Sequence, residues 1–386
     1  MRTISADYIF PVSSPPIKNG VVVVDDNGTV LEVTNQQSQD AEVFKGVIVP
    51  GFVNTHCHLE LSYLKGKINE GKGLTGFFSE LLPIRNKTSE EVKISTIKDA
   101  EEQMICNGIV AVGDISNTSH SFRQKKEKKI SYHTFIEVFD ILPERAAQVF
   151  ENAKALSAEL LPLASTIVPH TSYTVSEKLL QLIDEKKQKM ISVHNQETSS
   201  EDEFFISGTG KLAELMQKSG VVSKKTGSSS MHYILSRITN SKKILLVHNT
   251  YTTREDILWL KSRNKSHKTK IFLCLCPNAN LYIENRLPDI PMFLKEEMNL
   301  CIGTDSLASN HSLSVLEELK TISKHFPKIP FETLIRWTTK NGAEFLGMEK
   351  EIGTIEKGKK PGLNLLKGIS IDKIKFSEKT SVKKLI

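Results

Sequence analysis

Two histidines separated by one residue, His56 and His58, have the residue type and spacing best suited to chemistry in this chain. They follow the apolar run 47–49 and 52–53, which is typical of a buried strand. Because residues two apart on a strand point to the same face, both imidazoles lie on one side. Such a pair is either half of a site for zinc or iron, or a surface alternation of polar residues.

Further apolar runs along the chain also end in a residue that can bind a metal or carry a proton. The residues at these ends are His170, His194, His248 and Asp305. In a parallel barrel the carboxyl ends of the strands meet on one face, and that face carries the active site. The pattern therefore predicts one site built from many strands, and it favours a metal site over surface alternation for His56 and His58.

Short apolar runs alternate with longer amphipathic stretches through the middle of the chain, and this predicts strands joined by helices. The expected strands lie near 46–55, 109–115, 130–139, 164–169, 190–194, 243–248, 270–276 and 299–304. The expected helices include 90–107, 144–159, 176–187, 253–262 and 313–324, with Ser176 as an N-cap. The predicted fold class is α/β, a (β/α)8 TIM barrel over residues 49–349.

The two ends of the chain have a different pattern. Short alternating runs with a turn at 26–28 precede the first predicted strand, and the tail 353–366 resembles them. We expect residues 1–48 and 350–386 to form one small, discontinuous β-sandwich domain. The polar stretch 223–230 is expected to be a loop between the fifth and sixth barrel strands.

Composition excludes several classes of protein. The 386 residues are 39% hydrophobic and 25% charged, as in ordinary globular proteins. The net charge of +6 comes from scattered lysines without interleaved aromatic residues, so we expect a small-molecule substrate and no nucleic-acid partner. No apolar stretch approaches the roughly 20 residues that cross a bilayer. We therefore expect a cytoplasmic location with no membrane partner and five reduced cysteines. Whether the chain forms a homodimer stays open.

An ordered set of motifs surrounds the candidate residues. These motifs are PGFVNTHCH at 50–58, PHTSYT at 169–174, HNQET at 194–198, His248, CPNAN at 276–280 and GTDSLASN at 303–310. Together they resemble the amidohydrolase superfamily, and within it the branch of cytosine deaminases, chlorohydrolases and S-adenosylhomocysteine deaminases. The resemblance covers nearly the whole chain.

The resemblance implies a ligand set for one divalent metal, zinc first and iron as the alternative: His56, His58, His194 and Asp305. It also implies that Glu197, His248 and Asp305 are the catalytic residues. Three imidazoles and a carboxylate suit such an ion independently and leave room for a water. Two-metal relatives carry a carboxylated lysine at the end of the fourth strand. His170 stands there in this chain, which favours a single metal.

Substrate contacts are also implied by the resemblance, and they fall on His170, Asn280, Ser309 and Asn310. For His170 a purely structural role as a capping or loop-anchoring histidine is the alternative. Leu74, Phe77 and Phe78 are expected either to cover the substrate ring or to pack under their loop. The remaining histidines, at 120, 133, 232, 267, 311 and 325, match no motif and are expected at the surface or in packing.

The family branch implies hydrolytic deamination of an aromatic amine ring. The motifs look most like those of chains that deaminate aminodeoxyfutalosine, a 6-aminopurine nucleoside of menaquinone biosynthesis. Adenosine-like nucleosides, S-adenosylhomocysteine, guanine and s-triazines are the other candidate substrates. A hydrolase of cyclic amides or of a carbon–halogen bond is the alternative activity. A non-catalytic barrel is less favoured because all four metal-binding residues are present.

Overall fold

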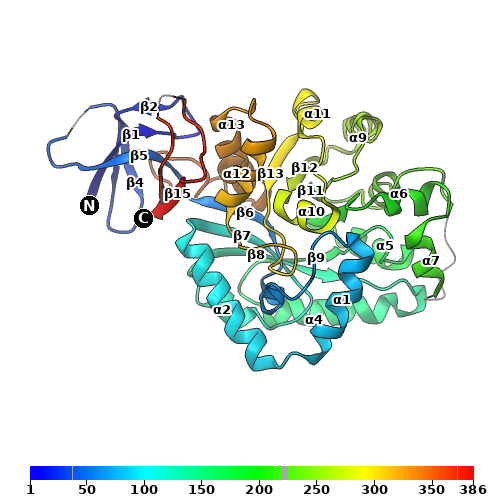
Figure 1. The fold of residues 1–386 in the computed structure, drawn as a ribbon. Coiled ribbons are helices and arrows are strands. Elements are labelled where there is room, and N and C mark those ends of the chain that lie inside the picture. Colours follow the sequence, from blue (N-terminus) through cyan, green and yellow to red (C-terminus); the bar gives the residue numbers. More distant parts are fainter. Residues whose placement is uncertain (37, 219–224, 372) are drawn as a thin grey trace.

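Eight parallel strands form two four-stranded sheets at the centre of the molecule. The structure is a computed structural model that describes residues 1–36, 38–218, 225–371 and 373–386 (Figure 1). The first sheet contains, in order, β6 (Phe52–Cys57), β7 (Ile109–Ser116), β8 (Ser131–Val138) and β9 (Ser165–Pro169). The second contains β10 (Met190–Asn195), β11 (Lys243–His248), β12 (Lys270–Leu275) and β13 (Asn299–Ile302).

The outer strands of the two sheets meet at both ends of this order. A parallel bridge pairs Cys57 at the end of β6 with Asp305, which follows β13. At the other seam, His194 N on β10 donates a hydrogen bond to the carbonyl of His170, which follows β9. All eight predicted strands are present. The first of them is divided in two, because β5 (Glu42–Pro50) belongs to a different sheet from β6.

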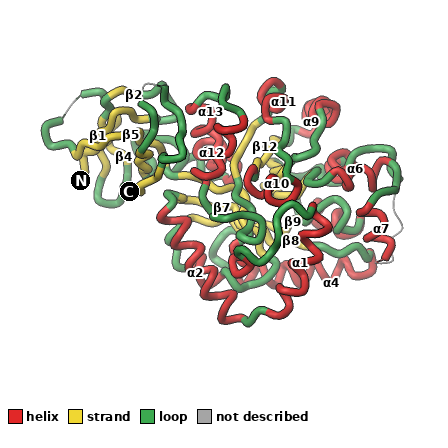
Figure 2. The backbone as a smooth tube through the Cα atoms, in the orientation of Figure 1, coloured by secondary structure: helices red, strands yellow, loops and turns green. Residues whose placement is uncertain are grey.

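Helices cover the outside of the two sheets (Figure 2). The five predicted helices are present as α2 (Glu90–Cys106), α4 (Ala146–Glu159), α5 (Glu177–Glu185), α9 (Arg254–His267) and α12 (Val315–His325). Ser176 caps α5, since its side chain accepts from Leu179 N. The other helices include α1 (Gly73–Lys87), α6 (Ser199–Ile206), α7 (Lys211–Lys218), α8 (Ser230–Leu235), α10 (Pro277–Glu284), α11 (Ile290–Lys295), α13 (Phe331–Arg336) and α14 (Gly342–Leu346).

The predicted loop 223–230 is seen only in part. Its first two residues lie outside the described residues, and Ser230 already belongs to α8. Among the helices that the structure describes, none combines the length and the hydrophobicity needed to cross a membrane.

The two ends of the chain share one mixed sheet of seven strands, beside which both termini lie (Figure 1). Its strands are β1 (Arg2–Ile9), β2 (Ile17–Lys18), β3 (Val21–Val24), β4 (Val30–Thr34), β5, β14 (Leu363–Lys367) and β15 (Ser381–Lys384). Because β5 pairs in parallel with β1 and antiparallel with β14, it joins the N-terminal and C-terminal strands edge to edge. The result is one continuous sheet instead of the two facing sheets of the expected β-sandwich.

His133 on β8 is one of the histidines expected at the surface or in packing, and it is buried, with 6% of its surface exposed. Its Nε2 lies 3.1 Å from Thr166 Oγ1 on the neighbouring strand β9, and its ring packs against Phe135. Burial and, to a smaller extent, the nearby Lys125 charge lower the pKa of His133 to about 4. The folded protein therefore holds this imidazole in its neutral form.

We expect His133 to contribute acid sensitivity to the fold. The folded pKa of about 4 lies below the ordinary value of 6.5, so the folded state binds fewer protons than the unfolded state. The free energy of unfolding is therefore unaffected by His133 above pH 6.5, and it falls by about 3 kcal/mol as the pH drops towards 4. Urea unfolding of metal-stripped protein at a series of pH values should show this loss in wild type and a smaller one in His133→Gln. If the free energy of unfolding depended on pH in the same way in both proteins, this role of His133 would be contradicted.

Candidate functional site

Four predicted metal ligands converge at the carboxyl ends of the strands. His56 and His58 lie at the end of β6, His194 lies on β10, and Asp305 follows β13; their ligand atoms lie within 4.8 Å of one another. The Nε2 atom of His58 is 3.1 Å from that of His56 and 3.3 Å from that of His194. Asp305 Oδ1 lies 3.4 Å from His58 Nε2. All four residues are buried, so the cluster could hold one ion.

The protonation of these side chains fits a divalent cation. His194 Nδ1 lies 3.1 Å from the His170 carbonyl, which can only accept, so the proton is on Nδ1 and the Nε2 lone pair faces the cluster. Burial lowers the pKa of His56, His58 and His194, which keeps the imidazoles neutral. Neutral imidazole is the form that binds a metal. The set matches zinc or ferrous iron equally well.

Asp305 supplies the single negative charge. Burial would raise the pKa of this carboxyl, but the neighbouring imidazoles of His56, His58 and His248 hold it below its ordinary range. Ser309 Oγ also donates to Asp305 Oδ2 at 2.5 Å. Asp305 is thus an ionised carboxylate at neutral pH.

Close backbone contacts fix Asp305 against His56. Asp305 has a left-handed backbone, with φ at 54°, and its amide donates to the His56 carbonyl at 3.1 Å. A Cβ added at Gly303 would lie 2.8 Å from His56 Cβ, so only glycine lets the two strands approach this closely. The position of one ligand therefore determines the position of the other.

Glu197 and His248 stand beside the cluster. Asn280 Oδ1 lies 2.8 Å from His248 Nδ1 and can accept its proton, which leaves His248 Nε2 facing Glu197 Oε1 at 3.7 Å. Burial raises the pKa of Glu197 well above its ordinary range, and Asp305 and Glu284 raise it further. Burial thus favours the protonated form of the Glu197 carboxyl and the neutral form of the His248 imidazole that faces it, which is an arrangement suited to moving protons.

The structure adds Glu201, which the sequence motifs do not identify. Its Oε1 accepts from Glu197 N at 2.8 Å, and its Oε2 accepts from Gln196 N at 3.1 Å. Gln196 has a left-handed backbone with φ at 45°, so the segment before α6 turns sharply here. Glu201 therefore positions Glu197. A glutamate in the first turn of a helix, four residues after another glutamate, is the only local signal for this role.

A second unpredicted support lies behind His58. Lys125 and Asp114 are both fully buried and form an ion pair at 2.5 Å. The other oxygen of Asp114 accepts from Leu59 N at 2.8 Å, at the start of the 3-10 helix η1 (Leu59–Leu64). Removing one partner of a buried ion pair costs about 3–5 kcal/mol, so Asp114 is held firmly in place. Asp114 in turn fixes the chain after His58 through Leu59 N.

The predicted substrate contacts fall into two groups. His170 lines the cavity above the cluster, its Nδ1 lies 3.0 Å from Thr174 Oγ1, and burial lowers its pKa to about 4. Asn280 bonds to His248, Ser309 to Asp305, and Asn310 to Glu318 Oε1 at 2.7 Å. These three are not among the described residues that line the cavity, so here they support the site from behind.

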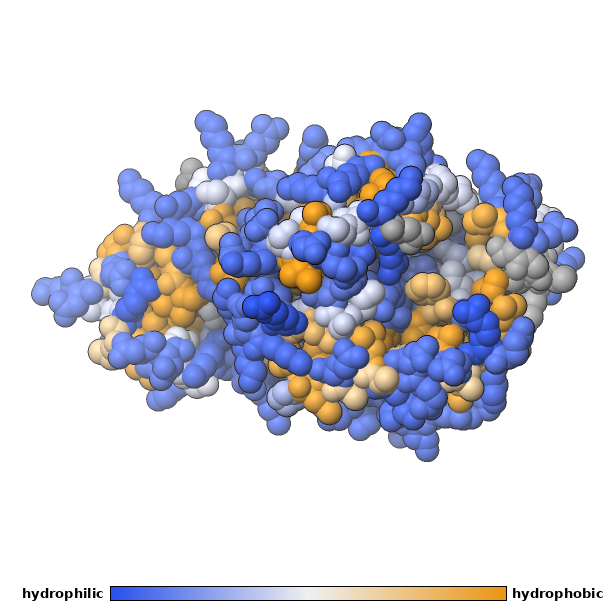
Figure 3. Space-filling model, turned by 90° about the horizontal axis from the view of Figure 1, so that it is seen from below, coloured by the Kyte–Doolittle hydropathy of each residue, from blue (hydrophilic) through white to orange (hydrophobic). Residues whose placement is uncertain are grey.

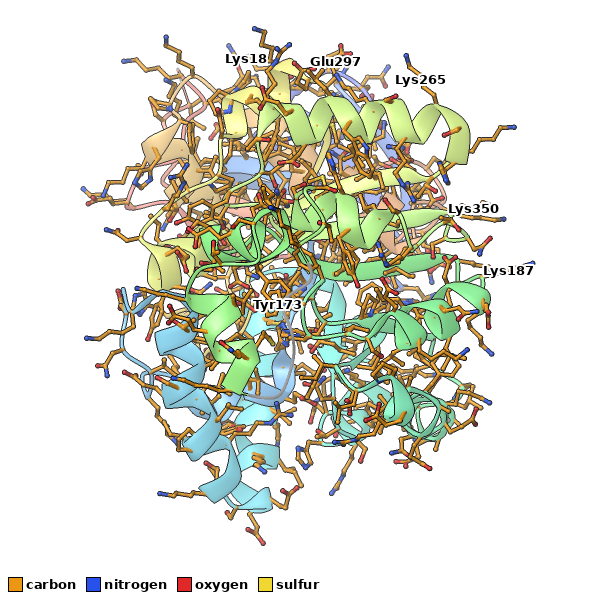
Figure 4. All side chains as sticks on the ribbon, turned by 90° about the vertical axis from the view of Figure 1, so that its right-hand side faces the viewer. Lys18, Tyr173, Lys187, Lys265, Glu297 and Lys350 are labelled. Atoms are coloured by element: carbon orange, nitrogen blue, oxygen red, sulfur yellow. The ribbon has the colours of Figure 1, made fainter. Side chains whose placement is uncertain are left out.

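The cavity has a volume of about 280 Å³ and a largely apolar wall. Leu74, Phe77 and Phe78 lie on α1 and line it, while Leu74 and Phe77 also pack in a buried cluster with Tyr63 and Leu64. Packing of this segment is therefore confirmed, and the expectation that it covers a substrate ring stays a prediction. On the face seen from below, hydrophobic residues gather beside a hollow (Figure 3). Tyr173, another lining residue, lies towards the middle of the molecule, whereas Lys187 and Lys265 lie at its edge (Figure 4).

Comparison with known proteins identifies the family. The sequence model of the amidohydrolase family matches residues 47–386. The chain belongs to the amidohydrolase family. It is therefore a metal-dependent hydrolase that acts on carbon–nitrogen bonds, as the motifs predict.

The relatives and solved structures that resemble the chain cover most of it. A 5'-deoxyadenosine deaminase of Methanosphaera stadtmanae is 23% identical over 369 residues, which cover 90% of this chain and 81% of the relative. A 5-methylthioadenosine/S-adenosylhomocysteine deaminase of Bacillus cytotoxicus is 23% identical and covers 89% and 79%. The crystal structure of Helicobacter pylori aminofutalosine deaminase with methylthio-coformycin has a TM-score of 0.79 at 22% identity, covering 95% of this chain and 92% of that one.

We expect His58→Ala to lose tight metal binding. Its Nε2 lies within 3.4 Å of one ligand atom from each of the other three residues of the cluster. Equilibrium dialysis with zinc should give one ion per wild-type chain and roughly 100-fold or greater loss of affinity in the variant. His120→Ala is the matched control, because His120 pairs with Glu90 outside the cluster. Equal zinc affinity in both variants would contradict this assignment.

Proposed function

We propose that this protein removes the exocyclic amine of a 6-aminopurine nucleoside by hydrolysis, with aminodeoxyfutalosine as its substrate. The observation that carries the proposal is the pairing of Glu197 with His248 beside the cluster of His56, His58, His194 and Asp305. Deamination needs an ion to activate water, an acid for the ring nitrogen and a base for the water proton. The site offers a group for each of these tasks.

Each residue has a separate task in the proposed reaction. A bound divalent ion would polarise the attacking water and lower its pKa from about 15.7 towards about 7. His248 Nε2 and the Asp305 carboxylate take the proton that this water loses when it attacks the carbon bearing the amine. Glu197 donates its proton to the adjacent ring nitrogen, so negative charge does not accumulate on the ring.

The second half of the reaction releases ammonia. Glu197, now ionised, takes the proton of the new hydroxyl group and passes it to the leaving amine. The carbon–nitrogen bond breaks, and the oxygen from water remains as the carbonyl of a lactam. The proton held by His248 and Asp305 then returns to Glu197 and restores the starting state. His248 also hydrogen-bonds the oxygen as it gains negative charge. The water and the nucleoside together supply every atom of the two products. The buried surroundings of Glu197, which favour its protonated form, support its role as the acid.

The choice of substrate rests on the relatives and on the cavity. Deaminases of 5'-deoxyadenosine and of 5-methylthioadenosine are among the similar proteins, as is the aminofutalosine deaminase of Helicobacter pylori. The first two are named for adenosine derivatives that are altered at the 5 position of the sugar. A largely apolar wall that includes Phe77, Phe78 and Phe139 would accommodate an apolar or aromatic group there.

We also propose how the parts of the chain are organised. The contacts between β6 and Asp305 and between His170 and His194 support closure of the two sheets into one (β/α)8 barrel over residues 49–349. Residues 1–48 and 350–386 would form the separate small domain. A separate buried cluster that includes Ile4, Ile9, Val22 and Leu365 supports this division.

Glu197→Gln should abolish turnover while metal binding persists. The amide keeps the shape of the side chain but cannot donate and then recover a proton, so we expect kcat to fall at least about 1,000-fold. Ammonia release and zinc content should be measured on the same preparations. Ser207→Ala is the control, because Ser207 lies at the exposed end of α6. A Glu197→Gln enzyme that retains wild-type turnover would refute the mechanism.

A panel of substrates tests the activity itself. Zinc-loaded protein should release ammonia from aminodeoxyfutalosine, 5'-deoxyadenosine, 5-methylthioadenosine, S-adenosylhomocysteine, adenosine, guanine and an s-triazine at different rates. We expect the highest kcat/KM with aminodeoxyfutalosine. A faster reaction with another nucleoside would correct the substrate but keep the activity. No ammonia from any compound would favour the hydrolysis of a cyclic amide or a carbon–halogen bond.

A further inference from the structure

Glu137 is a buried carboxyl group that the proposed mechanism does not use. It lies on β8, has 6% of its surface exposed, and lines the cavity. Its Oε2 accepts a hydrogen bond from Asn117 Nδ2 at 3.1 Å. Within the described part of the chain, its Oε1 has no hydrogen-bond partner. A buried acceptor without a donor is costly, by about 1–3 kcal/mol, and calls for an explanation.

A second metal ion does not explain this oxygen. Glu137, His170 and His194 do form a group whose ligand atoms lie within 4.8 Å of one another. However, the nitrogen of His194 nearest to Glu137 is Nδ1, at 3.4 Å, and its proton is shared with the His170 carbonyl. Without a free lone pair on Nδ1, this group lacks one of its three ligands.

The surroundings of Glu137 show where in the cavity a donor would come from. Asn117 and Arg85 line the same part of the wall, and both contact the buried Glu60: Asn117 N donates to Glu60 Oε2 at 3.1 Å, and Arg85 Nη2 lies 3.7 Å from Glu60 Oε1. Asn117 Nδ2 also donates to the Glu137 carbonyl at 3.0 Å. Glu137, Asn117 and Arg85, together with the buried Glu60 that Asn117 and Arg85 contact, thus form a polar corner of the cavity.

This polar corner is separate from the groups that carry protons. Glu137 and Asn117 come from the first parallel sheet, on β8 and after β7, whereas His248 ends β11 in the second sheet and Glu197 follows β10. The side chains of all four line one cavity, so a ring held beside Glu197 and His248 would leave its other substituents facing the remaining wall, of which Glu137 is part. Arg85 and Glu60 oppose each other's charge in this corner, since Arg85 Nη2 lies 3.7 Å from Glu60 Oε1. A neutral donor such as a hydroxyl is compatible with this corner.

We infer that Glu137 Oε1 accepts a hydrogen bond from a sugar hydroxyl of the nucleoside and makes the enzyme selective for substrates that carry a ribose diol. The inference rests on the proposed function and names the residue that recognises the part of the substrate away from the reacting carbon. A pocket oxygen built to accept a hydrogen bond discriminates strongly against an analogue without the donor, because that oxygen then stays buried and unpaired.

The test compares two variants on two matched substrates. Glu137→Leu removes the acceptor at similar size, and Glu137→Gln keeps a polar group at the position. The substrates are 5'-deoxyadenosine, or aminodeoxyfutalosine if it reacts faster, and its 2',3'-dideoxy analogue. For wild type we expect loss of the diol to lower kcat/KM about 10- to 100-fold, mainly through KM. For Glu137→Leu we expect kcat/KM with the diol substrate to fall by a similar factor, and kcat/KM with the dideoxy analogue to equal the wild-type value. Glu137→Gln should recover part of the loss.

Metal content and the pattern of losses distinguish the outcomes. Zinc per chain should stay at the wild-type value in both variants. Equal losses of kcat/KM on both substrates, or a lower zinc content, would mean that Glu137 positions His194 and would overturn the inference alone. If the wild-type enzyme releases no ammonia from any nucleoside, the proposed function fails and the inference fails with it. If Glu137→Leu does not fold, the same two substrates are compared on Glu137→Gln. An equal fall in kcat/KM on both substrates, relative to wild type, would also overturn the inference.

Discussion

The convergence of three imidazoles and one carboxylate in a buried space is the constraint on which the rest of the structure depends. The Nε2 atom of His58 lies 3.1 Å from that of His56 and 3.3 Å from that of His194, and neutral imidazoles with lone pairs directed inwards gain nothing from such contacts. Only a rigid frame can hold them so. The Nδ1 atom of His56, which has no hydrogen-bond partner within the described residues, marks what this arrangement costs. The backbone contacts of Asp305 and the carbonyl of His170 supply the rigidity on either side of the cluster.

Much of the fold follows from local patterns in the sequence. Buried parallel strands are nearly continuous apolar runs, which makes them visible along the chain, and all eight appear close to their predicted bounds. The division between β5 and β6 was not visible, because one apolar run spans two sheets; Gly51 is the break, where a Cβ would meet Val110 and the Pro361 carbonyl. The seven-stranded sheet was missed for a related reason. Which strands pair edge to edge depends on long-range contacts such as that between β5 and β14.

The residues of the site also differ in how far the sequence predicts them. His56, His58, His194 and Asp305 could be predicted to meet because each stands at a strand end, and strand ends meet by topology. Asn280, Ser309 and Asn310 could be placed near the site but not oriented, since a motif gives position and not the direction of a side chain. Glu201 and Glu137 were missed altogether. Their roles come from partners such as the Glu197 amide and the cavity wall, and neither carries a sequence signal distinct from any other glutamate.

The ligand cluster lies where the two parallel sheets are joined least by strand pairing. One seam, between β6 and the segment after β13, carries His56 and Asp305; the other, between β9 and β10, carries His194. Regular ladders run within each sheet, whereas the seams depend on isolated contacts. An ion held by ligands from both sheets would therefore join them at both seams, and ligand binding that favours only the folded state adds to its stability. The four residues proposed to hold the metal would then also stabilise the arrangement of strands that brings them together.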